Sequence, residues 1–546
     1  MGLVTKAGVE EVTRRITRSA IGSAGFKEQL TEAVTQVAAA ASTRDVTTAV
    51  ASTGDAISGG LTRASDLGSA LSDRLFGTSR PAPAATPAPK EAPERNVPQE
   101  ALVEEMSGRA PTFFLHAEGL GHETAYNMIN SELLLDGSAR LNLATFCTTS
   151  MPAYADKLMA ETADKNMIDK DEYPQTAEME NRCVNIISNL WNSPAGEDAI
   201  GCSTTGSSEA VMLAGLAMKW RWRAKMRAAG KPTDRPNLVT GANVQVCWDK
   251  FMRYWDIEER IVPLEGDKLC LTADRLKDYV DENTIGVATV LGSTFDGRYE
   301  PFTEIAAELD RIQEETGLDI PLHIDAASGG FVAPFIQPEL VWDFRLPRVC
   351  SINASGHKYG LVYPGVGWAI WRSAEYLPEE LIFHVNYLGG DMPTFSLNFS
   401  RPGSEVVAQY FMFASLGFDG YTKVQQHSSH VAQYLASEIE KIGPYELITR
   451  GDDLPVFAFK LKDSVTNYTV FDVSERLRER GWQVPAYTYP ANREDLAVLR
   501  IVVRAGMTHD MADLLLADLR RHTAKLECLS GPLPSSIESD DQIFAH

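Results

Sequence analysis

The chain has 546 residues, 44% of them hydrophobic, so it is long enough for a large core and for more than one domain. Its formal net charge of −23 argues against nucleic acid as a partner, because Lys and Arg must neutralise a nucleic-acid backbone. No apolar run approaches the length of a membrane span, and no apolar segment follows the first charged residues, so neither a membrane span nor a secretory signal is predicted.

The cysteines bear on the compartment. All seven are scattered along the chain without a CxxC pair. This pattern is typical of reduced thiols in the cytoplasm, and it argues against a zinc site or a disulfide framework. We therefore expect a cytoplasmic protein with no metal site.

Residues 1–100 differ in composition from the rest of the chain. They contain only two aromatic residues, Phe26 and Phe76, and are rich in Ala, Ser, Thr and Gly. Residues 81–98 form a Pro/Ala-rich linker. We expect residues 1–100 to be a largely disordered or weakly helical extension, with a self-association or docking segment as the alternative. An N-terminal arm, residues 101–140, is expected to follow.

From about residue 110, short apolar strands alternate with longer helical stretches. Apolar periodicity predicts helices over residues 177–191, 208–229 and 302–317. Apolar runs bounded by turn residues predict strands over residues 237–241, 286–292, 320–325, 348–353 and 365–371. This alternation indicates an α/β fold with a mostly parallel sheet, which we assign to a large domain of residues 141–428.

The remaining elements indicate a second, smaller domain. Long helices are predicted over residues 405–418 and 424–442, and shorter elements follow at 456–461 (strand), 471–480 (helix) and 499–503 (strand). We assign residues 429–530 to a small α+β C-terminal domain. Residues 531–546 are expected to be an acidic, loop-like tail.

A single stretch carries the strongest chemical signal. In Ser355-Gly356-His357-Lys358, a lysine follows a strand and a glycine-flanked turn. A second short strand upstream ends in Asp325 and runs into small residues. A lysine amine and a strand-delivered carboxylate are what pyridoxal phosphate (PLP) requires, because the lysine binds the cofactor and the carboxylate keeps its pyridine nitrogen protonated. The alternative is a solvated lysine on a surface turn.

A possible phosphate site precedes these residues. Gly206-Ser207-Ser208 opens the helix predicted over residues 208–229. Free backbone N–H groups, hydroxyls and the positive end of a helix together favour an anion such as a phosphate. Simple capping of the helix by the serines is the alternative.

The order of these signals, phosphate cradle, then Asp-Ala-Ala, then His-Lys, is that of fold-type I PLP enzymes. From roughly residue 111 to residue 529 the chain resembles the glutamate decarboxylases, within the PLP-dependent group II amino-acid decarboxylases. The resemblance rests on segments along its whole length: Asn142-Leu143-Ala144-Thr145-Phe146-Cys147, Ile168-Asp169-Lys170, Met218-Lys219-Trp220-Arg221-Trp222-Arg223, His323-Ile324-Asp325-Ala326-Ala327-Ser328-Gly329-Gly330, Ser355-Gly356-His357-Lys358 and Asn398-Phe399-Ser400-Arg401-Pro402.

The resemblance implies a role for each matching residue. Lys358, Asp325 and His357 would form the catalytic group, with Lys358 carrying PLP. The cofactor would also contact Ser207, Ser208, Gln245, Thr294 and Ala327, together with Ser400 from a neighbouring subunit. The substrate would contact Thr145, Phe146 and Asp169 at its distal carboxylate and Arg500 at its α-carboxylate, although Arg500 could instead form a salt bridge between domains.

The resemblance also implies a reaction. It is the PLP-dependent α-decarboxylation of L-glutamate to 4-aminobutyrate (GABA) and CO₂, in a homodimer or higher homo-oligomer with shared active sites. A decarboxylase of another acidic amino acid, another lyase on the same scaffold and a non-catalytic PLP-fold interaction protein remain alternatives. We see no calmodulin-binding helix at the C-terminus, where His546 instead ends a tail that could plug the active site at neutral pH.

Overall fold

The structure is a computed structural model that describes residues 112–113, 115, 119–196, 199–386 and 392–531. By its internal contacts the chain divides into two units, Met1–Ala125 and Tyr126–His546, and the architecture below is that of the second. The expected extension over residues 1–100, its linker, and the tail from residue 532 to His546 lie outside the described residues.

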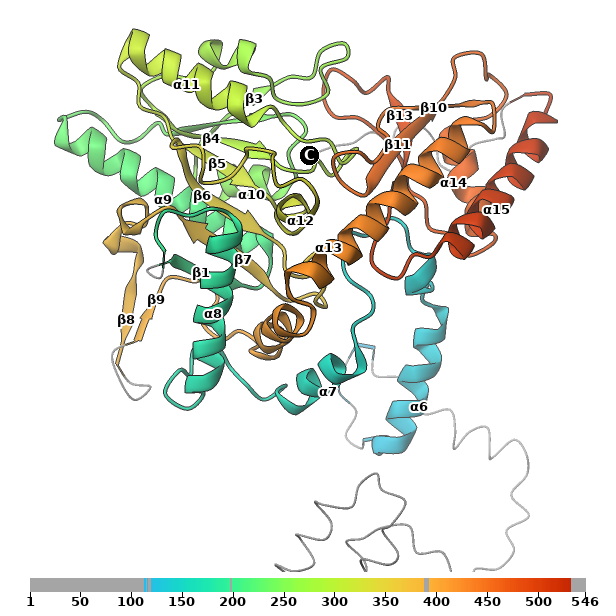
Figure 1. Cartoon of the computed structure of the whole chain (residues 1–546), viewed down its shortest axis with the longest axis horizontal. Coiled ribbons are helices and arrows are strands. Elements are labelled where there is room, and N and C mark those ends of the chain that lie inside the picture. The colour runs from blue at the N-terminus through green and yellow to red at the C-terminus, as the bar shows by residue number, and fades with distance from the viewer. Residues whose placement is uncertain (1–111, 114, 116–118, 197–198, 387–391, 532–546) are drawn as a thin grey trace, which may run out of the picture. The chain divides into compact units, whose positions relative to one another are not determined.

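A seven-stranded sheet forms the centre of the larger unit (Figure 1). Its strand order is β1-β7-β6-β5-β4-β2-β3. The neighbours from β3 to β6 run parallel, whereas β7 is antiparallel to both β6 and β1. The strands are β1 (Ile200–Thr204), β2 (Asn237–Gly241), β3 (Glu258–Val262), β4 (Thr284–Val290), β5 (Leu322–Asp325), β6 (Val349–Ala354) and β7 (Gly367–Trp371). The mostly parallel α/β sheet that we predicted is confirmed.

Helices cover both faces of this sheet. Alternate strand residues belong to different buried clusters: Val239 and Val287 pack with helices α8 and α11, whereas Leu238 and Ala288 pack with α9 and α10. A strand buried on both faces is the expected result of helical crossovers between parallel strands. The helices of this layer are α7 (Ala153–Glu161), α8 (Pro174–Leu190), α9 (Ser207–Ala228), α10 (Cys247–Tyr254), α11 (Phe302–Thr316) and α12 (Ala333–Ile336).

The long helix α13 (Ser404–Glu440) joins this sheet to a second one. We predicted two helices here, and the backbone does leave the helical conformation at Gly417 (φ 60°, ψ −173°). Beyond it, β10 (Tyr445–Leu447), β11 (Val456–Leu461), β12 (Ala486–Thr488) and β13 (Ala497–Val502) form an antiparallel sheet in the order β10-β11-β13-β12. Helices α14 (Val470–Arg478) and α15 (His509–Glu527) share its buried cluster. The exact domain boundaries at residues 141, 428 and 530 stay predictions.

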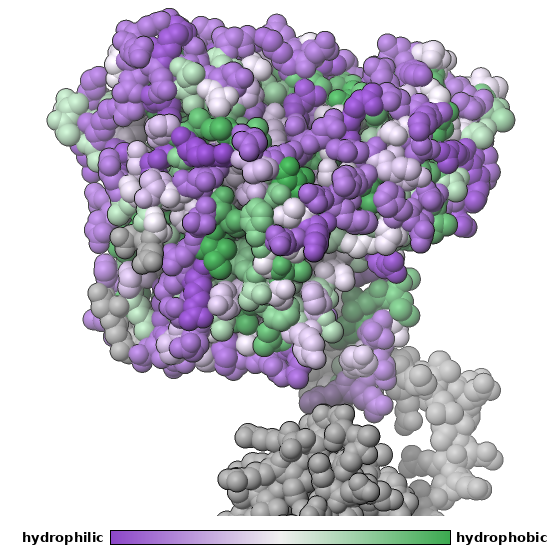
Figure 2. All heavy atoms as spheres, viewed as in Figure 1, coloured by the Kyte–Doolittle hydropathy of each residue, from purple (hydrophilic) through white to green (hydrophobic). Residues whose placement is uncertain are grey.

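Shorter elements complete the description. Strands β8 (Phe383–Val385) and β9 (Met392–Thr394) form a small hairpin, and helix α6 (His122–Glu132) has no buried residue. The 3₁₀ turns are η1 (Leu133–Leu135), η2 (Ala139–Leu141), η3 (Ala273–Asp278), η4 (Gly329–Phe331), η5 (Ala374–Tyr376) and η6 (Glu379–Leu381). Figure 2 shows a mainly hydrophilic face with hydrophobic residues gathered near its middle. Among the helices within the described ranges, none combines the length and the apolar character needed to cross a membrane.

Candidate active site

A cavity of about 480 Å³ lies where strands β5 and β6 end. Asp325 is the last residue of β5, and Lys358 follows β6 by four residues. Crevices at the carboxyl ends of parallel strands are where α/β proteins bind ligands. The cavity brings together all but two of the residues that we predicted for cofactor and substrate: Thr145, Phe146, Ser207, Ser208, Gln245, Thr294, Asp325, Ala327, His357, Lys358 and Arg500.

Lys358 is half-buried, and its amine lies inside this cavity. Its Nζ donates to Ser328 Oγ at 3.2 Å and lies 5.1 Å from the centre of the Phe146 ring. Burial lowers the pKa of Lys358, although the nearby Asp325 carboxylate opposes the shift. A lowered pKa raises the fraction of neutral amine, which is the nucleophilic form. The alternative of a solvated surface lysine is therefore wrong.

The turn that carries Lys358 tolerates no side chain at Gly356. A Cβ atom there would lie 2.3 Å from Gln409 Oε1 and 2.8 Å from Val366 Cγ1. The glycine thus lets the turn pack closely against α13 and β7, which fixes the position of the lysine that follows.

Asp325 is 3% exposed and receives three hydrogen bonds. Its Oδ1 accepts from Asn353 Nδ2 at 2.9 Å and from the Ala327 N–H at 3.1 Å, and its Oδ2 accepts from Trp248 Nε1 at 3.0 Å. Both oxygens of the carboxylate are thus held by hydrogen-bond donors. A buried anion that faces a cavity fits the protonated pyridine nitrogen of PLP.

The opposite part of the cavity is suited to a phosphate. Helix α9 begins at Ser207 after the N-cap residue Gly206, and no side chain caps it. The predicted alternative, in which the serines merely cap the helix, is therefore wrong. His357 Nδ1 is buried without a hydrogen-bond partner among the described residues, and burial together with Lys358 lowers the pKa of His357 to about 4. An unpartnered imidazole beside a helix N-terminus and serine hydroxyls fits a phosphate group.

Arg500 reaches the cavity from β13 of the four-stranded sheet. Its Nη2 donates to the Ala144 carbonyl at 2.6 Å and its Nη1 donates to the Thr294 carbonyl. The guanidinium carbon lies 5.0 Å from the centre of the Phe146 ring, and Nε has no partner within the described ranges. The contacts of Arg500 with protein groups are thus to carbonyls and rings, which leaves its charge available to a substrate carboxylate.

Asp169 and Ser400 do not line this cavity. They are instead joined to each other through Asn166, whose Nδ2 donates to Ser400 Oγ at 3.2 Å and whose carbonyl accepts from the Asp169 N–H at 3.1 Å. Ser400 was expected to contact the cofactor bound by a neighbouring subunit. Asp169 was expected beside Thr145 and Phe146, and within one chain the structure does not place it there.

Several residues of the site escaped the sequence analysis. Ser328 and Ser355 lie in the quoted motifs but received no role, although both line the cavity. Asn353 could have been found from its two-residue spacing to Ser351 on a buried strand, which places both on one face. Trp248 gave no local signal, because its contact with Asp325 spans 77 positions of the sequence.

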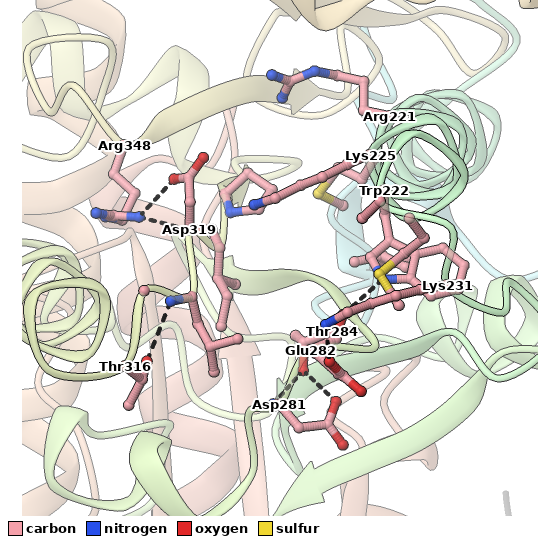
Figure 3. A pocket seen from close by; sticks show the side chains of 18 of the residues that line it. Arg221, Trp222, Lys225, Lys231, Asp281, Glu282, Thr284, Thr316, Asp319 and Arg348 are labelled. Atoms are coloured by element: carbon pink, nitrogen blue, oxygen red, sulfur yellow. Dashed lines mark hydrogen bonds and ion pairs between the residues drawn. The ribbon is translucent and has the colours of Figure 1, made fainter.

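A second cavity, of about 580 Å³, lies at the amino ends of β4 and β5 (Figure 3). Its charged side chains pair mainly with one another, as the dashed lines between Arg348 and Asp319 (3.5 Å) illustrate. Lys231 likewise pairs with Glu282 at 2.5 Å. No group of three or more His, Cys, Asp or Glu in the described part of the chain could hold a metal ion. The cavity around Lys358 is therefore the better candidate for chemistry.

Comparisons with known proteins identify the family of this chain. A family model described as "Pyridoxal-dependent decarboxylase conserved domain" matches residues 122–462. A glutamate decarboxylase of Aliivibrio fischeri is 59% identical over 398 residues, covering 72% of this chain and 86% of the relative. A glutamate decarboxylase of Solanum lycopersicum is 49% identical over 427 residues, covering 78% and 85%. The solved glutamate decarboxylase of Lactobacillus brevis superposes with a TM-score of 0.75 at 48% identity, over 77% of this chain and 96% of that one.

Proposed function

We propose that this chain, which belongs to the pyridoxal-dependent decarboxylase family, uses PLP to convert L-glutamate to GABA and CO₂. The observation that carries the proposal is the convergence of Lys358, Asp325 and Arg500 on one cavity, beside an unpartnered His357. The relatives named as glutamate decarboxylases support glutamate as the substrate.

The residues present fit the cofactor. Lys358 would hold PLP covalently, Asp325 would keep the proton on its ring nitrogen, and Gln245 and Ala327 would flank the ring. The phosphate would be held by Ser207, Ser208 and His357, and Thr294 would lie towards the 3-hydroxyl. When bound, PLP supplies an electron-withdrawing ring that accepts the electron pair left by the departing CO₂.

The chain's own residues perform the remaining work. Burial lowers the pKa of Lys358, which makes its protonated amine a stronger acid, so Nζ could donate the proton that Cα gains once CO₂ has left and would remain as the neutral amine. Arg500 orients the α-carboxylate through donors that the protein leaves unused. Phe146, 7% exposed and lying between Lys358 and Arg500, excludes water from the reacting centre.

A neighbouring subunit would complete the site. Thr145 and Phe146 would meet the distal carboxylate of glutamate from the same chain, and the segment that joins Asp169 to Ser400 would enter from a second copy. Exposed apolar residues support self-association, since Leu134 is 79% and Leu135 is 90% exposed in the single chain. We therefore propose a homodimer or larger homo-oligomer with shared sites. A cytoplasmic location stays a prediction, in keeping with seven free cysteines.

Purified protein tests the enzymatic proposal. We expect a visible absorption band of bound cofactor that borohydride abolishes, and CO₂ release from glutamate in preference to aspartate, cysteine sulfinate and aromatic amino acids. Lys358→Ala should lose both, whereas Lys157→Ala, on an exposed side chain, should lose neither. No band would refute the enzyme, and a band with faster turnover of another amino acid would refute the substrate.

Co-expression tests the shared site. Lys358→Ala and Asp169→Ala chains should each be inactive or nearly so when made alone. If the site is shared, a mixed dimer holds one intact site and its activity should recover. Two variants that fail to complement each other would place Asp169 in its own chain's site.

A further inference from the structure

A line of buried polar side chains stands behind Asp325 and begins at Asn353. The Asn353 amide group donates from Nδ2 to Asp325 Oδ1 at 2.9 Å, and its Oδ1 lies 2.8 Å from His323 Nε2. The reverse orientation of the amide would point its oxygen at the Asp325 carboxylate, where two acceptors would repel each other. The amide orientation is therefore fixed by its partners.

This orientation determines the role of one ring nitrogen of His323. Because Asn353 Oδ1 can only accept, His323 Nε2 must carry a hydrogen and donate it. Ser351 Oγ lies 2.8 Å from Nδ1, where a hydroxyl can either donate or accept. Burial lowers the pKa of His323 to about 4, so the ring is neutral, carries its hydrogen on Nε2 and accepts from Ser351 at Nδ1.

The sheet register builds this line. His323 pairs with Ser351 and Asp325 pairs with Asn353 across β5 and β6, so the four side chains share one face. His323 and Asn353 are 0% exposed and Ser351 is 1% exposed. The Trp248 ring meets the His323 ring edge to face, with centres 5.2 Å apart, while its Nε1 donates to Asp325 Oδ2. The carboxylate is therefore held on both oxygens by groups that have no freedom to turn away.

We propose that Asn353, His323 and Trp248 are positioning residues, which keep Asp325 an oriented anion for the cofactor's ring nitrogen. Asn353 and Trp248 act on the carboxylate directly, and His323 acts through Asn353 by fixing its amide. The inference rests on PLP binding, which the proposed function shares, but it does not depend on which amino acid is decarboxylated. A network in which every polar atom is satisfied is rigid, and removing one donor leaves a buried acceptor short of a bond.

The decisive measurement is the affinity of the full-length protein for PLP, together with the visible spectrum of the bound cofactor. Trp248→Phe keeps an aromatic ring and removes only the donor to Asp325. Trp222→Phe is the matched control, because Trp222 is also buried and its Nε1 donates to the Glu282 carbonyl, away from the site. A hydrogen bond to a charged group accounts for about a ten-fold to hundred-fold change in an equilibrium constant. We expect that loss of PLP affinity for Trp248→Phe and Asn353→Ala, and none for Trp222→Phe.

A double-mutant cycle tests the indirect role of His323. Ser351→Ala and His323→Gln should each weaken PLP binding in the natural chain, but should add little in an Asn353→Ala background, because the amide that they fix is gone. Ser351→Ala introduces no bulk, so it decides the case if His323→Gln fails to fold.

Three outcomes would overturn the inference: equal effects of Trp248→Phe and Trp222→Phe on PLP affinity, unchanged affinity for Asn353→Ala, or effects of Ser351→Ala that persist in full without Asn353. If the natural protein binds PLP but does not decarboxylate glutamate, the substrate assignment alone is refuted.

Discussion

Replacing Asp325 by Asn removes one charge and almost no volume, so its effect reports on that charge. The amide must put an NH₂ group where one oxygen was. Oδ1 accepts from Asn353 and Ala327, and Oδ2 accepts only from Trp248, so the NH₂ would take the second position and face the Trp248 Nε1–H. Two donors would then face each other at a position where the native Asp325 is only 3% exposed.

The expected loss follows from the burial of this carboxylate. Removing one partner of a buried ion pair costs about 3–5 kcal/mol. Since each 1.36 kcal/mol corresponds to about a ten-fold change in rate, kcat for Asp325→Asn should fall roughly a hundred-fold to several-thousand-fold at saturating PLP. The assay is CO₂ release from glutamate, with bound PLP quantified in the same samples.

Asp343→Asn provides the control for this experiment. Asp343 is also buried, at 1% exposure, and pairs with Arg345 at 2.8 Å, but it does not line the cavity. Its replacement should lower the melting temperature and leave kcat within a few-fold of the natural value. The reasoning would be refuted if the two variants lost activity equally, or if Asp325→Asn kept kcat within ten-fold.

Three further predictions concern the substrate and pH. Arg500→Lys keeps the charge but loses the fork that bonds Ala144 and Thr294, so KM for glutamate should rise about ten-fold, with bound PLP unchanged in its absorption spectrum; an unchanged KM would contradict the role. If Asp169 faces the distal carboxylate of glutamate, one of the two must be protonated, so KM should be lower at mildly acidic pH and Asp169→Asn should flatten that dependence; a wild-type KM profile in the variant would count against it. Burial lowers the pKa of His323 from 6.5 to about 4, so between these pH values the unfolded chain binds more protons than the folded one. The free energy of unfolding should therefore fall as the pH drops through this window, by up to about 3 kcal/mol from this residue. Burial raises the pKa of Glu300 to about 7, which acts in the opposite direction. The test is therefore the difference in the free energy of unfolding between wild type and His323→Gln, measured with denaturant from pH 7 to pH 4. Equal dependence of that free energy on pH in the two proteins would refute the assignment.

Local pattern predicted most of the sheet because its strands are short apolar runs between turns. Residues 237–241 and 456–461 have the expected bounds of β2 and β11. Strand β1 was missed, since Gly201 and Ser203 in a five-residue run carry little strand propensity. Gly201 is needed because a Cβ would lie 2.5 Å from Ile370 Cδ1 on β7, a contact that arises only once the sheet forms.

The residues of the site likewise divide into those that local sequence predicts and those that long-range contacts position. Lys358, Asp325 and Ser207 could be predicted because they lie in motifs whose chemistry is local, whereas the role of His357 was implied by the family resemblance. The position of Asp169 could not, because it depends on the link through Asn166 to Ser400, which is 234 residues distant from Asn166. The side-chain donors to Asp325 were missed for the same reason, since they come from β6 and α10.

Because Arg500 lies on β13, catalysis depends on how the four-stranded sheet is positioned against the seven-stranded one. Two hydrogen bonds near Arg500 join these parts of the chain, and we call them the inter-sheet contact. The Tyr487 hydroxyl donates to the Phe295 carbonyl, and the Tyr489 hydroxyl donates to Asp296 Oδ2 at 3.0 Å. A shift at this inter-sheet contact would move the Arg500 guanidinium relative to Lys358, while the hydrogen bonds within each sheet stay intact. Substitutions at Tyr489, outside the cavity, should therefore alter substrate alignment while cofactor binding persists. Such lesions would give a coloured, folded and poorly active protein.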